Sequence, residues 1–279
     1  MDCAVIDIGS NSVRLMISSN GMTEKFLAVT QLGRGVSKTG NLSKESIQDT
    51  LVALEKFCAQ AKDYPIYAFA TEAVRSAKNG REFLSEVYQK IGLEVDLLSP
   101  LEEALAGFLG ATDGKRATVI DIGGASTEFA CGDRGVIERS VSTPIGAVKL
   151  NDKCKDDEKD AENYLSKTFG EFEFKGEIIG IGGTITTLGA MSLGLSTYQK
   201  EFVHGYVLTL SEVERLIEKL SCTSVDERMK LFPVLPAKRA SVILSGALLL
   251  RYIMKKYNLP SVRLSDSDNT EGYLIMRGV

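Results

Sequence analysis

Short apolar runs with an aspartate in the next-to-last position open both halves of the chain. Residues 1–8 and 117–122 have the continuous, β-branched composition of buried strands. Glycine and hydroxyl residues follow each run, where a tight turn brings the backbone close to other groups. Apolar segments at 13–17 and 26–30 come next, and Asn20-Gly21 between them is typical of a type I′ hairpin. The pattern predicts that the chain begins with an antiparallel meander.

The opening pattern returns 114 residues later. Asp7-Ile8-Gly9-x-x-Ser12 recurs as Asp121-Ile122-Gly123-x-x-Ser126, and two strands are again expected after the turn. An internal repeat of this kind predicts two similar half-molecules. We therefore expect two lobes, residues 1–112 and 113–279, whose glycine turns line one cleft. The last few residues are candidates for packing back on the first lobe.

Apolar positions at helical spacing predict helices between the strands. Residues 43–61 are amphipathic, and residues 239–252 are apolar enough for a buried helix. Another helix is expected to begin after Ser99, because Ser99 and Glu102 have the spacing of a capping box. A strand at 93–98 precedes it. The alternation of strands and helices indicates an α/β fold.

Composition and charge exclude several classes of protein. The formal net charge of −4 argues against a general nucleic-acid binder. The five cysteines form no C-x-x-C pair, which favours reduced thiols in the cytoplasm over a structural zinc site. The longest apolar stretch, 240–250, is shorter than the roughly 20 residues that cross a bilayer, and no signal peptide is evident. We expect a cytoplasmic protein with no membrane or nucleic-acid partner.

The second glycine turn carries candidate chemistry of its own. Its backbone N–H groups would form a concavity for an anion, and Ser126 and Thr127 add hydroxyl donors. Asp121 at the mouth would repel phosphate unless it holds a divalent cation. The turn therefore indicates a phosphate and magnesium site. A hairpin that merely needs glycine explains the same residues equally well.

A series of motifs extends along almost the whole chain: Asp7–Leu15, Ala70–Asn79, Glu102–Ala104, Asp121–Glu128, Pro144–Leu150, Gly180–Thr184, Arg239–Ala240 and Ser265–Asp266. In this order they resemble the exopolyphosphatase/guanosine pentaphosphate phosphohydrolase (Ppx/GppA) family. The resemblance implies two actin-like (ribonuclease H-like) lobes of the sugar kinase–Hsp70–actin superfamily, with a cleft between them. A single histidine cannot build the additional metal domain of longer members, so the short, two-domain form is expected.

The resemblance implies an enzyme that hydrolyses the terminal phosphoanhydride of inorganic polyphosphate, with Mg²⁺ as cofactor, and that forms a homodimer. Guanosine pentaphosphate is the alternative substrate. A non-catalytic sensor of guanosine polyphosphates or polyphosphate is a rival interpretation. An ATP-dependent kinase is a weaker one, because the nearest candidate for an adenosine pocket, Leu244–Ala247, lies inside an apolar helix.

The resemblance also implies site residues. The capping box engages Glu102 and leaves Glu103 free to face the cleft, and the catalytic glutamate of the family aligns with Glu103. The alternative is that both acids only stabilise the helix N-terminus. Lys149 and Arg239 are further basic candidates, with ordinary ion pairs as the alternative. The candidate phosphate ligands are Ser10, Asn11, Ser12, Arg14, Arg75, Gly123, Gly124, Ala125, Ser126, Thr127, Gly182, Gly183 and Thr184. The candidate metal ligands are Asp121, then Glu128 and Asp7.

Three positions depart from the family pattern, and the first is Ser76, where the family often has an acidic residue. Ala125 stands where a third glycine is usual, and its methyl group is tolerated only if the backbone φ stays negative. Thr270 stands where the family tends to carry arginine, which removes one basic contact. His204 is expected to be structural, because no acid or nucleophile pattern lies near it.

Overall fold

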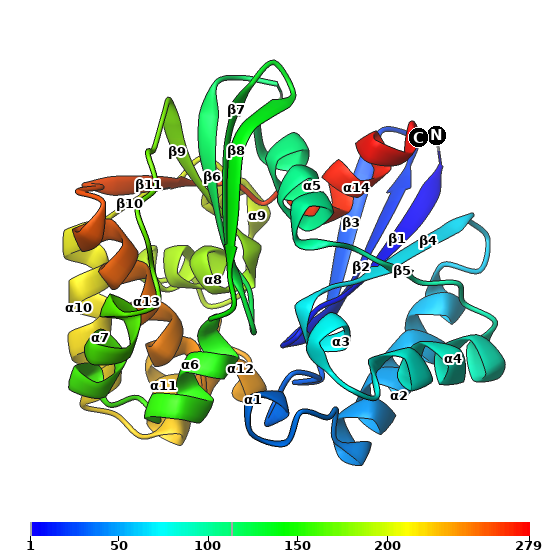
Figure 1. Ribbon diagram of the computed structural model, residues 1–279, viewed down its shortest axis with the longest axis horizontal. Coiled ribbons are helices and arrows are strands. Elements are labelled where there is room, and N and C mark those ends of the chain that lie inside the picture. The colour runs from blue at the N-terminus through cyan, green and yellow to red at the C-terminus, as the bar shows by residue number, and fades with distance from the viewer. Residues whose placement is uncertain (1, 113) are drawn as a thin grey trace.

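The computed structural model describes residues 2–112 and 114–279, which form two lobes built on mixed β-sheets (Figure 1). The first sheet has the order β3-β2-β1-β4-β5, with β1 (Cys3–Ile8), β2 (Ser12–Ser19), β3 (Met22–Val29), β4 (Ile66–Ala70) and β5 (Asp96–Leu97). The second has the order β10-β11-β9-β6-β7-β8, with β6 (Ala117–Ile122), β7 (Thr127–Asp133), β8 (Val136–Thr143), β9 (Glu177–Ile181), β10 (Val207–Thr209) and β11 (Ser261–Leu264).

The two sheets repeat one topology. In each, a three-stranded antiparallel meander comes first, and the next strand pairs in parallel with the first strand of the meander. The predicted meander and the predicted internal repeat are confirmed, and the lobes have the expected actin-like α/β fold. The predicted division between residues 112 and 113 falls at Asp113, which lies outside the described residues.

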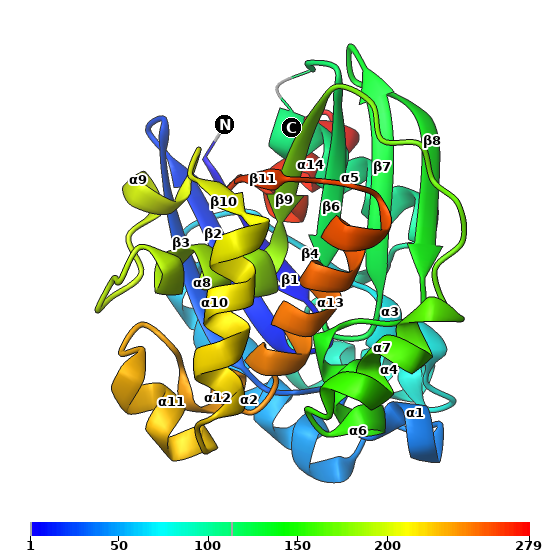
Figure 2. The ribbon, with the colours of Figure 1, turned by 90° about the vertical axis from the view of Figure 1, so that its left-hand side faces the viewer.

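Helices cover the outer faces of both sheets. In the first lobe they are α1 (Val36–Thr39), α2 (Lys44–Gln60), α3 (Glu72–Ser76) and α4 (Gly80–Ile91). In the second they are α6 (Ala147–Cys154), α7 (Glu158–Ser166), α8 (Gly182–Ser192), α9 (Lys200–Val203), α10 (Leu210–Ser221), α11 (Val225–Leu231), α12 (Ala237–Ala240) and α13 (Ile243–Lys256). Figure 2 shows α10 and α13 lying in front of the second sheet. No helix in the described ranges is both long and apolar enough to cross a bilayer.

Alternate residues of β1 pack against two different layers. Ile6 and Ile8 belong to the core formed with α2 and α4, whereas Val5 packs with Phe69 and Tyr273 on the opposite face. Successive side chains of a strand point to opposite faces, so a strand covered on both sides reads as a continuous apolar run. This explains the unbroken apolar pattern at the start of the chain.

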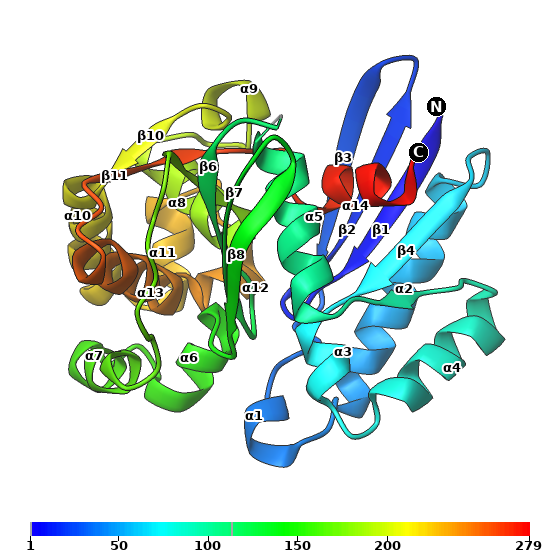
Figure 3. The same ribbon diagram turned by 45° about the horizontal axis from the view of Figure 1, so that its top comes forward.

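Two helices, α5 (Pro100–Thr112) and α14 (Asn269–Arg277), lie side by side between the sheets (Figures 1 and 3). A Cβ on Gly272 of α14 would lie 1.7 Å from the Ala106 carbonyl oxygen of α5, so only glycine permits this approach. Ala106 faces the first lobe, while Ala104 and Phe108 face β6, β7 and β9 of the second. The chain thus returns from the second sheet to the first lobe, and its two ends lie close together (Figure 1).

Two sequence expectations were wrong in extent. The strand expected at 93–98 is reduced to β5, in which Asp96 and Leu97 pair with β4. The helix expected over 239–252 is divided into α12 and α13. At the break, two backbone carbonyl groups accept hydrogen bonds from side chains. Gln31 donates to Lys238 O at 3.0 Å, and Asn151 donates to Ser241 O at 2.6 Å.

Candidate active site

A pocket between the lobes is lined by three glycine turns, at residues 9–12, 123–126 and 182–184. Asp7 and Asp121 enter it from the ends of β1 and β6, and Glu103 enters from the first turn of α5. The predicted residues that line it are Asp7, Ser10, Asn11, Ser12, Arg14, Glu103, Asp121, Gly123, Gly124, Ser126, Gly182, Gly183 and Thr184. Arg239 lines it as well, and five others lie outside its lining, namely Arg75, Ala125, Thr127, Glu128 and Lys149.

The first two turns close in the same way and touch each other. Gly9 N–H donates to Ser12 O at 3.1 Å, and Gly123 N–H donates to Ser126 O at 3.0 Å. A Cβ on Gly124 would lie 2.8 Å from the Cβ of Ser10, so the turns of the two lobes are in contact. The repeat in the sequence therefore places two equivalent turns face to face.

The third turn, residues 182–184, is the first turn of α8 and lies beside Asp121 near the end of β6. Gly182 has a φ of +83°, and a Cβ there would lie 2.3 Å from Asp121 Oδ1. A Cβ on Gly183 would lie 2.7 Å from Nη2 of Arg239. These two residues therefore bring the backbone directly beside an acid and a cation, which leaves no room for a side chain at either position.

The two glutamates at the start of α5 have different surroundings, as the sequence predicted. Glu102 is exposed and accepts a hydrogen bond from Ser99 N–H at 2.8 Å, while its own N–H donates to Ser99 Oγ at 3.3 Å. Glu103 is only 6% exposed and lines the pocket. Burial, partly offset by Arg75, raises the pKa of Glu103 to about 8. The capping box is confirmed, and Glu103 is the acid that faces the cleft.

Arg75 contacts Glu103 rather than the pocket. Its Nη2 donates to Glu103 Oε2 at 3.1 Å and to Glu72 Oε2 at 2.7 Å, and its Nη1 donates to the Leu98 carbonyl. Both Nη atoms of the guanidinium therefore already have partners within the protein. In this structure Arg75 is placed to orient Glu103, whereas the sequence suggested a phosphate contact.

Several carboxylates are buried close together around the pocket. Burial raises the pKa of Asp121 to about 6 and holds the pKa of Glu128 well above its usual value, with Glu103 and Asp121 adding repulsion at Glu128. Glu128 lies outside the pocket lining, where Ser142 donates to its Oε1 at 2.8 Å and its buried Oε2 has no hydrogen-bond partner among the described residues. Like charges and an unpaired oxygen of this kind suit a hard divalent cation.

The acids do not form a complete coordination shell by themselves. Across residues 2–112 and 114–279, no three Asp, Glu, His or Cys side chains are gathered closely enough to hold a metal ion. Mg²⁺ is commonly held by one or two carboxylates together with water and substrate phosphates. The donors present therefore fit Mg²⁺ bound by Asp121 with at most one further acid, and substrate would supply the remaining oxygens.

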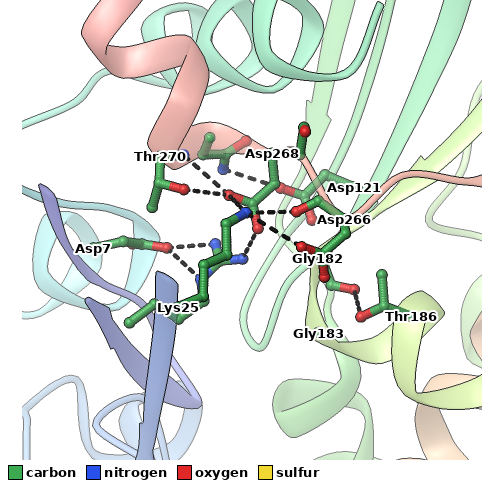
Figure 4. A network of polar contacts seen from close by, with 12 residues as sticks. Asp7, Lys25, Asp121, Gly182, Gly183, Thr186, Asp266, Asp268 and Thr270 are labelled. Atoms are coloured by element: carbon green, nitrogen blue, oxygen red, sulfur yellow. Dashed lines mark hydrogen bonds and ion pairs between the residues drawn. The ribbon is translucent and has the colours of Figure 1, made fainter. Parts of the chain in front are cut away.

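Arg14 is held between two aspartates in the structure. It pairs with Asp7 on the neighbouring strand and with Asp268 at the start of α14, and Lys25 lies beside the same group (Figure 4). Asn269 also lines the pocket, and its Nδ2 donates to Asp121 Oδ2 at 3.1 Å. Lys25, Asp268 and Asn269 are not among the predicted site residues; the signal that could have pointed to the last two is the run of polar residues at 265–271.

The remaining predicted residues either lie close to the pocket or have structural contacts. Arg239 is 9% exposed, donates to Thr187 Oγ1 at 2.6 Å, and forms no ion pair within the described part of the chain. Burial, with Arg14 nearby, lowers the pKa of Arg239 to about 10. Thr127 donates to Ile145 O at 2.6 Å, and Ala125 does not have a positive φ, so its methyl group is accommodated. His204 Nδ1 accepts a hydrogen bond from Asp266 N–H at 3.2 Å, as befits a structural residue.

Two mixed-sheet lobes with paired glycine turns at their junction define a two-lobed protein of actin-like fold. A family model for the Ppx/GppA phosphatase family matches residues 5–277, so the chain belongs to this family. It is 31% identical to the Aquifex aeolicus member of the Ppx/GppA family over 100% of this chain and 97% of that one, with a TM-score of 0.77.

Two curated relatives differ in length. The chain is 25% identical to exopolyphosphatase 2 of Mycobacterium tuberculosis over 96% of both proteins. It is 29% identical to a bifunctional 3-dehydroquinate synthase/phosphatase of Fusobacterium nucleatum over 99% of this chain, but it spans only 46% of that protein. The shared region therefore corresponds to about half of the longer relative.

Proposed function

We propose that the protein hydrolyses the terminal phosphoanhydride of inorganic polyphosphate and releases phosphate, with Mg²⁺ as cofactor. The observation that carries this proposal is the position of Glu103, a buried acid that faces the three glycine turns while its neighbour Glu102 caps the helix. The name of the Mycobacterium tuberculosis relative supports polyphosphate as the substrate. The cytoplasmic location and the homodimer expected from the sequence stay predictions.

In this mechanism Glu103 positions the attacking water and accepts its proton. A general base is most effective when its pKa lies near the working pH, and burial raises the pKa of Glu103 to about 8. Arg75 orients Glu103 through the 3.1 Å contact between Nη2 and Oε2. Loss of the proton to Glu103 makes the water oxygen a stronger nucleophile for the terminal phosphorus.

The glycine turns and Arg239 would hold the phosphate groups. Backbone N–H groups and hydroxyls of the turns are suitable donors for phosphate oxygens. Arg239 is a buried cation without an acidic partner in the described chain, and an anionic ligand would compensate its charge. Bound Mg²⁺, held by Asp121 with Glu128 or Asp7, would neutralise charge on the phosphate oxygens.

The test compares Glu103→Gln with Glu102→Gln as a matched control. Both changes remove one carboxylate from the same helical turn, but only Glu103 faces the pocket. We expect phosphate release from long-chain polyphosphate to fall by about 10²–10⁴-fold in Glu103→Gln, the range for loss of a general base. Glu102→Gln should keep near-normal turnover and lose only some thermal stability.

Three substrates separate the rival functions. Purified protein is incubated with Mg²⁺ and long-chain polyphosphate, guanosine pentaphosphate, or ATP with sugars. Release of phosphate from polyphosphate supports the proposal, whereas consumption of ATP identifies a kinase. Binding of polyphosphate without release identifies a sensor, and near-normal turnover by Glu103→Gln removes Glu103 from the mechanism.

Guanosine pentaphosphate is the second candidate substrate because a further cavity adjoins the pocket. This cavity has a volume of about 320 Å³ and shares Gly182 and Gly183 with the pocket. Its walls include Phe26, Leu27 and Val234. The apolar part of these walls suits a nucleoside better than a chain of phosphates.

A further inference from the structure

Three cations line the cavity behind the third glycine turn. Arg14 and Arg239 are shared with the main pocket, and Lys25 belongs to the cavity alone. Cations in a cleft attract anionic ligands, and this effect is stronger where the walls have a low dielectric constant. If only these three cations lined the cavity, it would be a subsite for additional phosphate groups of a substrate.

Carboxylates already neutralise two of these cations. Asp268 forms an ion pair with Arg14, whose guanidinium also contacts Asp7. Lys25 Nζ lies 2.8 Å from Glu271 Oε1 and 3.8 Å from Asp268 Oδ1 (Figure 4). Asp268 therefore pairs with both cations and occupies the position where a phosphate group would meet them.

Asp268 is fixed in this position by the start of α14. It is the N-cap residue of this helix and accepts hydrogen bonds from Thr270 N–H at 3.0 Å and Thr270 Oγ1–H at 2.9 Å. Its side chain is buried, with 6% of the residue exposed. Burial raises the pKa of Asp268, but Arg14 and Lys25 outweigh it and hold the pKa at about 2, so the group is charged at neutral pH.

We propose that Asp268 is a specificity-determining residue that excludes phosphate groups from this cavity by filling the anion subsite of Arg14 and Lys25. A phosphate group would have to displace a buried capping carboxylate or lie beside a like charge, and both are unfavourable. The cavity therefore accepts only an uncharged part of a ligand. Additional phosphate groups of a bound substrate extend from the main pocket in another direction. This inference rests on the proposed function only for the presence of phosphate in that pocket.

Thr270 belongs to the same arrangement. It is 1% exposed, and both its N–H and its hydroxyl hold Asp268. The position where the resemblance led us to expect arginine thus fixes an acid next to two cations. Threonine at position 270 therefore has two effects. It removes a basic contact, and it holds the negative charge of Asp268 where a ligand would approach.

The test measures binding of tripolyphosphate by isothermal titration calorimetry in EDTA, where the metal-dependent reaction is absent. Asp268→Asn removes the charge, while asparagine remains a good N-cap residue. We expect Asp268→Asn to bind tripolyphosphate at least about tenfold more tightly than the wild type, because one buried like charge is removed. Adding Lys25→Met to Asp268→Asn should reverse most of that gain.

Glu177→Gln is the matched control, because it makes the same charge change at an exposed ion pair with Arg263. Unchanged or weaker binding by Asp268→Asn would overturn the inference. So would an equal gain in Glu177→Gln, or a gain that persists with Lys25→Met. Absence of tripolyphosphate binding in both wild type and Asp268→Asn also overturns it, because the freed cations would then form no subsite.

A second variant covers the case in which Asp268→Asn does not fold. Asp266 lies outside the helix cap, and its Oδ2 is 3.8 Å from Lys25 Nζ, so Asp266→Asn should tighten binding in the same direction but less. No tightening in a folded Asp266→Asn variant would then reject the inference. Phosphate release by the wild type with Mg²⁺ is measured separately, so failure of the proposed function and failure of this inference are distinguished.

Discussion

Arg75 shows how one side chain can influence the reaction without touching substrate. It is 3.1 Å from Glu103 and is anchored by Glu72 and the Leu98 carbonyl. Burial raises the pKa of Glu103, and Arg75 is the largest opposing influence. The sequence suggested a cationic role for Arg75 but could not show that an acid, rather than phosphate, is its partner.

Arg75→Met should lower kcat and move its pH dependence. Because Glu103 acts in its ionised form, the rate should rise as pH increases through the pKa of Glu103. Removing Arg75 raises that pKa further, so the rising part of the profile should move to higher pH. Measurement of kcat against pH at saturating Mg²⁺ checks this. An unmoved profile would mean that Arg75 does not act through Glu103.

Gly182 has a positive φ and lies beside Asp121, and these two constraints can be separated. Gly182→Ala should cost about 1–2 kcal/mol of stability from backbone strain and, in addition, displace the Asp121 carboxylate. Gly194→Ala is the matched control, with a φ of +71° and open space around the added carbon. We expect both variants to lose thermal stability, Gly182→Ala more than Gly194→Ala, and a fall of about tenfold or more in phosphate release only for Gly182→Ala. Equal activity of the two variants would show that Asp121 tolerates displacement.

At the scale of elements, local patterns predicted the two opening meanders and the starts of the helices after Ser43 and Ser99. Ser99 and Glu102 gave a correct helix start because a capping box is made within four residues. The contact between Arg14 and Asp268 spans 254 positions, so no local pattern contains it. The break between α12 and α13 depends in the same way on Gln31 and Asn151, which are distant in sequence.

The capping box of α10 gives a pH-dependent contribution to stability. Burial raises the pKa of Glu212, but hydrogen bonds from Tyr206 and Thr209 outweigh it and lower the pKa from 4.5 to about 2. A lowered pKa in the folded state stabilises the protein above about pH 4.5, and this contribution is lost as pH falls toward 2.

Glu212→Gln should therefore lower the free energy of unfolding by about 1 kcal/mol at pH 7 and by less at pH 3. Urea unfolding at both pH values measures the two differences. Glu218→Gln, on the exposed face of the same helix, should leave stability almost unchanged. A constant difference between wild type and Glu212→Gln at both pH values would contradict this account.

At the scale of the whole molecule, α14 connects the two lobes through their packing. Tyr273 is 2% exposed and its ring centroid lies 4.7 Å from that of Phe69 in the first sheet. Tyr273→Ala should cost about 3–5 kcal/mol, as other large-to-small aromatic substitutions in cores do. Ile275→Ala on the same helix should cost little, because Ile275 is 53% exposed. Thermal unfolding of the two variants checks this, and equal losses would show that α14 is not anchored through Tyr273.

The return of α14 to the first sheet affects the order in which the protein becomes complete during synthesis. Val5, Met16 and Phe69 leave the ribosome early, but the Tyr273 and Leu274 side chains that cover them are made only after the second sheet. Until then the nascent first lobe presents an apolar face of the kind that chaperones bind. Its maturation thus waits for the chain to finish the other lobe, and the pocket between them forms in the same late step.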